Sequence, residues 1–130
     1  MKTPPAFVSA IDLAPTLCHM VGIDDQAQMH GRNAWDLVTG KAHALRRETF
    51  TRFANFAAVR NPQWHYFQHV EGHDLGAGPC LYDLQADPGE TKNVVQSHPE
   101  IAAELQSRLA DRLGQKLPEP ASGGKGLRQG

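Results

Sequence analysis

The segment from Glu48 to Val70 reads ETFTRFANFAAVRNPQWHYFQHV, and its composition decides the fold. Short runs rich in aromatic and β-branched residues follow one another, separated by the turn-compatible residues Ala54-Asn55 and Asn61-Pro62-Gln63. Runs of this kind between turns predict an antiparallel meander. We expect strands at residues 49–53, 56–60 and 64–70, and a fourth at residues 80–84 after a glycine-rich loop.

A helix is expected after the fourth strand. Pro99 suits the first position of a helix, and Glu100 suits its first turn, where the helix dipole favours negative charge. An apolar stripe follows at helical spacing: Ile101, Ala102, Leu105, Leu109 and Leu113. We expect this helix to cover the small sheet, which gives an α+β fold, and residues 114–130 to form a disordered tail.

An earlier helix is predicted at about residues 12–21. Asp12 is a candidate cap and Gly22 ends the helical pattern. Ala14, Leu17, Cys18 and Val21 share one face, which we expect to be buried. A polar stretch follows, and then a single helical turn at Trp35–Val38, closed by Gly40.

Composition excludes some classes of function. Thirteen basic and fourteen acidic residues leave a net charge of -1, so no strong field favours nucleic acid or an anionic membrane. No apolar run is long enough to span a bilayer, and no targeting segment is visible, so the compartment is left open. Cys18 and Cys80 match no zinc-ligand spacing, and whether they pair is left open.

The run Leu81-Tyr82-Asp83-Leu84, followed by Asp87, Pro88, Glu90 and Asn93, is spaced as a strand and a turn. It resembles the L-Y-D-L-x-x-D-P-x-E-x-x-N signature near the C-terminus of sulfatases, in the alkaline-phosphatase superfamily. Pro88 fixes a backbone angle for the turn, and Asp87 can accept backbone N–H groups. The motif therefore indicates ancestry and has a structural role.

Two earlier segments resemble the same family. Asp12, Pro15, Thr16 and Gly22 fit its V-S-x-x-D-x-x-P-T-L pattern and the glycine beyond, and Gly31-Arg32 fits the G-R stretch that follows. Residues 58–66 resemble its A-V-R-x-x-x-W-K-Y strand pair, with His65 where lysine is usual. The resemblance implies that residues 1–40 are the tail end of a large α/β catalytic domain and residues 41–113 a C-terminal subdomain.

The chemistry that the resemblance implies lies outside these motifs. Intact sulfatases use a calcium ion and a formylglycine made from Cys or Ser in a C-x-P-S-R or similar motif. Neither Cys18 nor Cys80 lies in such a motif, and Asp24-Asp25 follows the P-T-L helix rather than preceding it. We therefore assign no catalytic residue, cofactor ligand or metal ligand to this chain and expect it to be inactive alone.

Other residues invite functional interpretations. Arg60 and His65 are candidates for the rim of a substrate pocket. His65, His69 and His73 recur every four residues, but four strand residues span about 13 Å, too far to share a zinc ion. We expect solvated or edge-strand histidines instead. The carboxylates of Asp83, Asp87 and Glu90 are explained by the turn rather than by acid–base catalysis.

Two hypotheses of different class remain. The first is a C-terminal fragment of a sulfuric ester hydrolase whose intact form acts on a sulfate ester; within the same superfamily, a phosphodiesterase or phosphonate hydrolase fragment is the alternative. The second is a stand-alone binding module for a protein partner or a sulfated glycan. In either case the uncovered N-terminal helix predicts self-association.

Overall fold

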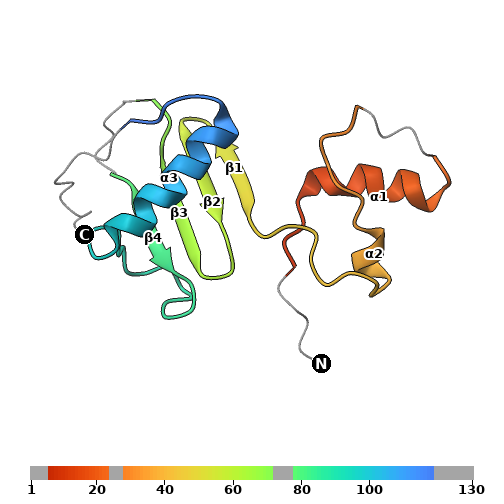
Figure 1. The fold of residues 1–130 in the computed structure, drawn as a ribbon, viewed down its shortest axis with the longest axis horizontal. Coiled ribbons are helices and arrows are strands. Elements are labelled where there is room, and N and C mark those ends of the chain that lie inside the picture. Colours follow the sequence, from red (N-terminus) through yellow and green to blue (C-terminus); the bar gives the residue numbers. More distant parts are fainter. Residues whose placement is uncertain (1–5, 24–27, 72–77, 119–130) are drawn as a thin grey trace. The chain divides into compact units, whose positions relative to one another are not determined.

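The structure is a computed structural model that describes residues 6–23, 28–71 and 78–118. The chain forms two compact units, Met1–Thr49 and Phe50–Gly130. The first unit is built from short helices, and the second combines a sheet with one long helix (Figure 1). The predicted α+β class is confirmed.

The sheet has four strands, β1 (Thr49–Phe53), β2 (Phe56–Arg60), β3 (Trp64–His69) and β4 (Cys80–Asp83). Their order in space, β1-β2-β3-β4, is their order along the chain. Antiparallel pairing places Val59 opposite Tyr66 and Tyr66 opposite Leu81. The predicted meander and its fourth strand are therefore confirmed.

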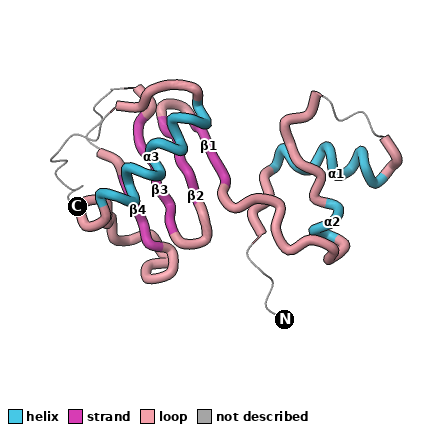
Figure 2. The backbone as a smooth tube through the Cα atoms, in the orientation of Figure 1, coloured by secondary structure: helices cyan, strands magenta, loops and turns pink. Residues whose placement is uncertain are grey.

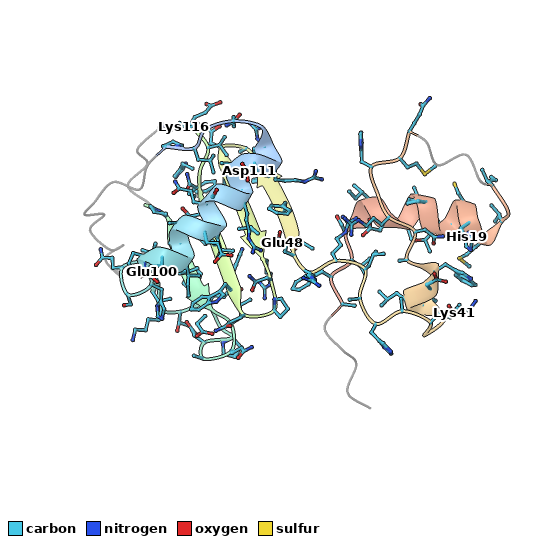
Figure 3. The ribbon with its side chains drawn as sticks, viewed as in Figure 1. His19, Lys41, Glu48, Glu100, Asp111 and Lys116 are labelled. Atoms are coloured by element: carbon cyan, nitrogen blue, oxygen red, sulfur yellow. The ribbon has the colours of Figure 1, made fainter. Side chains whose placement is uncertain are left out.

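Helix α3 (Pro99–Leu113) crosses one face of this sheet, as Figure 2 shows. Its buried residues are Ala102, Leu105 and Leu109, so the predicted apolar stripe faces the strands. The charged residues Glu100 and Asp111 are exposed on the same helix (Figure 3). Gly114 ends the helix in the left-handed conformation, with φ of 66°, which glycine adopts without steric cost.

The core lies between α3 and the sheet. Its buried members are Ala57, Val59, Tyr66, Val70, Leu81, Ala102, Leu105, Leu109 and Leu117. Leu117 follows the helix and belongs to the stretch that the sequence assigned to a disordered tail. Its burial shows that the packed chain continues past Gly114; residues 119–130 lie outside the described part.

The first unit contains a 3-10 turn (η1, Ala10–Asp12), helix α1 (Leu13–Met20) and the short helix α2 (Trp35–Val38). Asp12 does not cap α1 with its side chain, contrary to expectation. Its carboxylate instead accepts the N–H of Ser9 at 2.8 Å and the N–H of Arg32 at 2.7 Å. It also pairs with the Arg46 guanidinium. The Asp12 carboxylate thus joins the start of η1, at Ser9, to the later segments that carry Arg32 and Arg46.

The prediction for the buried face of α1 is wrong. Leu17 is 50% exposed and Val21 72%, whereas Pro15 and Thr16 are buried. The hydroxyl of Thr16 accepts the N–H of Ala34 at 2.9 Å, so the segment leading into α2 lies against the Thr16 side of the helix. The apolar side is left uncovered.

None of the helices in the described parts of the chain combines the length and hydropathy that crossing a bilayer requires.

Candidate functional site

The sheet has a second face, opposite α3. Side chains of a strand alternate between the two faces, and the buried residues of β2, β3 and β4 point toward α3. The intervening residues form what we call the outer face: Phe56, Ala58, Arg60, His65, Phe67, His69, Cys80 and Tyr82. Both rim candidates from the sequence, Arg60 and His65, lie on it.

Arg60 and His65 are directly opposite each other on β2 and β3, and Glu90 joins them. Arg60 Nη1 donates to Glu90 Oε1 at 2.7 Å, and His65 Nδ1 lies at hydrogen-bond distance from Glu90 Oε2, also 2.7 Å. We call these three residues the rim cluster. The sequence predicted Arg60 and His65 as rim candidates and named Glu90 only as a structural motif residue, so its contact with them, from a turn 25 residues beyond His65, was not predicted.

The charge of Glu90 is stabilised by its two partners. Partial burial raises the pKa of Glu90, but the hydrogen bonds and charges of His65 and Arg60 lower it by more, so its net pKa is below the ordinary value. Glu90 is therefore ionised at neutral pH and offsets the positive charge of Arg60.

Because β3 lies between β2 and β4, His65 and His69 are not edge-strand residues. The expectation that they lie in solvent or at an edge is wrong, since the fourth strand pairs with β3 rather than leaving it free. The centroid of the His69 ring lies 4.0 Å from that of Phe56, and both its nitrogens are buried with no hydrogen-bond partner among the described residues. His73, the third histidine of the spacing, lies outside the described residues.

Aromatic rings extend across the outer face beside the rim cluster. The centroid of Phe67 lies 5.6 Å from that of His65 and 6.0 Å from that of Tyr82, on which it stacks. Phe56 meets the edge of Phe67 at 6.5 Å. These half-buried rings form an apolar floor next to polar groups, an arrangement that suits amphipathic ligands.

Cys80 lies at the β4 end of this floor. Burial raises the pKa of the Cys80 thiol, although a hydrogen bond with Tyr82 opposes the shift. Burial and the neighbouring Cys80 also raise the pKa of Tyr82. Both groups stay protonated at neutral pH, and the cysteine is not an activated nucleophile. Cys18 and Cys80 are both free thiols.

The turn after β4 is held by its own carboxylates. Asp83 Oδ1 accepts the N–H groups of Gln85 and Ala86, and Asp87 Oδ2 accepts those of Thr91 and Lys92 at 2.7 Å each. These bonds lower the pKa of Asp87, that from Lys92 most. The signature carboxylates Asp83 and Asp87 therefore fix the backbone that positions Glu90.

Asn93 ties the end of this turn back to the sheet. Its Oδ1 accepts the N–H of Leu81 at 3.0 Å and that of Val95 at 3.1 Å, and its Nδ2 donates to the carbonyl of Pro79. The Leu81 carbonyl accepts the N–H of Val94 in addition. A side chain thus supplies part of the pairing on the free side of β4.

The signature residues of the first unit also meet. Thr16 donates its hydroxyl to the carbonyl of Asp12 at 2.6 Å, beside the bond from Arg32 N–H to the Asp12 carboxylate. Gly31 lies so close to the Ile11 backbone that a β carbon would be 1.9 Å from its carbonyl oxygen. These residues close the loop that follows α1.

Within residues 6–23, 28–71 and 78–118, His, Cys, Asp and Glu form no group of three that could hold a metal ion. The rim cluster combines a guanidinium, an imidazole and a carboxylate, which can donate and accept hydrogen bonds.

Comparison with known proteins places these features in context. Residues 2–117 match a family described as N-sulphoglucosamine sulphohydrolase, C-terminal. The chain is 31% identical over 114 residues to the delta 4,5-hexuronate-2-O-sulfatase of Bacteroides thetaiotaomicron, covering 79% of this chain and 23% of that protein. It is 27% identical over 121 residues to arylsulfatase K of Mus musculus, covering 81% of this chain and 21% of that protein.

A solved structure from the metabolism of multiple glycosaminoglycans by Bacteroides thetaiotaomicron superimposes with a TM-score of 0.62 and 30% identity, covering 83% of this chain and 25% of that chain. The present chain therefore spans about a fifth to a quarter of the length of these relatives.

Proposed function

Because the chain belongs to the sulfatase family and corresponds to its C-terminal portion, we propose that it is the C-terminal part of a sulfuric ester hydrolase acting on a sulfated sugar. The family match over residues 2–117 carries this proposal. The relatives reported above bear sulfatase names or belong to glycosaminoglycan metabolism, which favours a sulfated sugar over a phosphodiester or phosphonate.

In this proposal the outer face contributes to the rim of the substrate pocket. Arg60 and His65 present a guanidinium and an imidazole beside the Phe67 floor. The motif residues around Asp12 and Asp87 have a structural role, since their carboxylates are used by backbone N–H groups of the chain itself. The division into residues 1–40 and 41–113 stays a prediction.

In this proposal the catalytic groups that cleave the sulfate ester belong to the large domain of the intact enzyme, which this chain does not include. When present, a formylglycine and a calcium ion would supply the nucleophile and the charge stabilisation for attack on the sulfate. Neither cysteine of this chain lies in a formylglycine motif, and its described residues form no metal-binding group. We therefore expect no turnover from the 130 residues alone.

Joining the chain to the reading frame encoded upstream tests this function. The joined protein should release sulfate from a sulfated hexuronate disaccharide, and the 130-residue chain should release none. Sulfate release by the short chain would contradict its inactivity. Failure of the joined protein on sulfated sugars and aryl sulfates alike would contradict the sulfatase function.

A stand-alone binding module is the second candidate, because the outer face pairs polar groups with aromatic rings without any need for catalysis. An upstream frame encoding C-x-P-S-R and an aspartate pair would favour the hydrolase. An unrelated upstream frame, together with binding of a sulfated glycan by the short chain, would favour the module.

The exposed apolar side of α1 favours self-association of the 130-residue chain. We call its exposed large residues the α1 surface: Leu13, Leu17, Met20 and Val21. Exposed apolar patches in a soluble protein mark contact sites. In the proposed enzyme the large domain would cover this surface, and in its absence we expect a second copy of the chain to do so.

A further inference from the structure

Glu90 has an unusual backbone. Its φ of 54° lies in the left-handed region, which costs a residue with a β carbon about 1–2 kcal/mol. The conformation is held from both sides, because the Glu90 N–H donates to the Asp87 carbonyl at 3.1 Å and the Asp87 carboxylate accepts the next two N–H groups. Local strain that neighbouring bonds maintain suggests a use for the side chain.

The Glu90 carboxylate lies between Arg60 and His65. Each of its oxygens accepts one hydrogen bond, from Arg60 on β2 and from His65 on β3. The turn thus holds two side chains of neighbouring strands in one fixed arrangement. Glycine at position 90 would adopt this φ more easily, but Arg60 and His65 would then lose their shared hydrogen-bond partner.

The bond to Glu90 decides which nitrogen of His65 carries the proton. An ionised carboxylate only accepts hydrogen bonds, so Nδ1 must be the donor. In a neutral ring Nε2 is then an acceptor with a fixed direction. The Phe67 ring at 5.6 Å supports the imidazole from the same strand. His65 is about 20% exposed, so a ligand can reach it.

Arg60 offers the complementary groups. The pair with Glu90 uses Nη1, the side chain is 44% exposed, and a guanidinium has five N–H donors. Its charge, however, is offset by Glu90. With a neutral imidazole the rim cluster has no net charge, which suits hydroxyl groups better than a sulfate anion.

We propose that Glu90 is a positioning residue that fixes Arg60 as a donor and the neutral form of His65 as an acceptor in a subsite for adjacent hydroxyls of the substrate sugar. Each hydroxyl of a pyranose can donate and accept, so a donor and an acceptor side by side can bind two adjacent hydroxyls. The apolar face of such a ring suits Phe67 and Tyr82. The proposal rests on the sulfatase function and assigns this site to the sugar rather than to the sulfate.

The tautomer of His65 tests the positioning role directly in the 130-residue chain. Long-range ¹H–¹⁵N correlation spectra above pH 8 should show the proton on Nδ1 in the wild-type protein. In Glu90→Gln the proton should move to Nε2, because Arg60 can pair only with the amide oxygen, which leaves the NH2 group to donate to Nδ1. Glu104→Gln is the matched control, since Glu104 pairs with Arg108 on α3 and should leave His65 unchanged. A wild-type ring protonated on Nε2 overturns the proposal.

Kinetics of the joined enzyme test the ligand. Glu90→Gln should raise KM for a sulfated sugar about tenfold, the effect of one or two weakened hydrogen bonds, and change kcat little. KM for 4-nitrophenyl sulfate, which has no sugar hydroxyls, should stay within about twofold of wild type. An equal rise for both substrates, or none for the sugar, overturns the subsite. Absence of any sulfate release from the wild-type joined enzyme refutes the sulfatase function instead.

Discussion

Gly31 lies against Ile11 so closely that a β carbon on Gly31 would be 1.9 Å from the Ile11 carbonyl oxygen. Twenty residues separate them in the sequence. The contact brings the N–H of Arg32 within 2.7 Å of the Asp12 carboxylate. One glycine thus allows the loop after α1 to return to the start of the helix.

Replacing Gly31 by alanine should therefore destabilise the first unit. The neighbouring atoms are backbone and cannot rotate away, so we expect a loss of about 1–3 kcal/mol, typical of overpacking. Faster hydrogen exchange at the amides of Arg32 and Ala34 would report it. Gly78→Ala is the control, because a β carbon there meets nothing within 4 Å. Equal exchange in the two variants would contradict the close packing.

The first unit should lose stability in acid. Burial raises the pKa of Asp12, but the hydrogen bonds from Arg46, Arg32 and Ser9 lower it by more, and its net pKa lies below the ordinary 3.8. A lowered carboxylate pKa stabilises the fold above the unfolded pKa, and this stabilisation is lost as pH falls through the folded pKa. Amide exchange at Arg32 should thus accelerate below about pH 4.

In the Asp12→Asn variant, amide exchange at Arg32 should no longer depend on pH in this range. The first unit should also be less stable at neutral pH, since Arg46 loses its charged partner. Asp36→Asn, an exposed change on α2, serves as the control. If amide exchange at Arg32 still accelerates in acid in the Asp12→Asn variant, another titratable group causes the loss of stability.

Truncation of Leu109 should destabilise the second unit strongly. The side chain is 0% exposed within the core between α3 and the sheet. Leu109→Ala should cost about 2–5 kcal/mol in the free energy of unfolding, measured by urea denaturation. The matched change Leu17→Ala, on the α1 surface, should cost under about 0.5 kcal/mol. Similar costs for the two leucines would contradict the assigned burial.

Asn93 should matter through its carbonyl oxygen. Asn93→Ala leaves the N–H of Leu81 without its acceptor and should cost about 1–3 kcal/mol. Asn93→Asp keeps an acceptor at the same position and should recover most of this loss. Urea denaturation of both variants measures the loss. If Asn93→Ala is as stable as Asn93→Asp, the hydrogen bond from the Leu81 N–H to residue 93 does not stabilise the fold.

Self-association should depend on the α1 surface. Sedimentation of the wild-type chain should show species larger than a monomer, and a double change of Leu17 and Val21 to lysine should restore the monomer. Phe53→Lys is the control, because Phe53 is an apolar residue on β1 that is exposed at least as much as Leu17 and Val21. A monomeric wild-type chain would refute the association.

Much of the second unit could be predicted from the sequence because its signals are local. Strand runs separated by short turns gave the meander, and the Pro99 start with leucines at helical spacing gave α3 and its buried side. For α1 the spacing of apolar residues predicted the wrong buried face. The side of the helix that is buried depends on the segment near Ala34 that packs against it, and the sequence of the helix does not specify this partner.

The site was only half predictable for the same reason. Resemblance to a strand pair identified Arg60 and His65, which face each other across β2 and β3. Glu90 was visible as a motif residue, but its contact with them depends on the path of a turn and on a positive φ. The interior position of His65 follows from the pairing of β3 with β4 in the predicted meander, and the expectation of an edge-strand histidine did not take that pairing into account.

The strand order has a consequence for how the second unit forms. Each of the four strands pairs only with its neighbours along the chain, so each pairing joins segments that are close in sequence. Such a topology has low contact order, and the entropy cost of closing loops rises with their length. The sheet can grow one hairpin at a time, with α3 folding back last to seal the core. We therefore expect this unit to fold rapidly and to find its topology without guidance from residues upstream of Thr49.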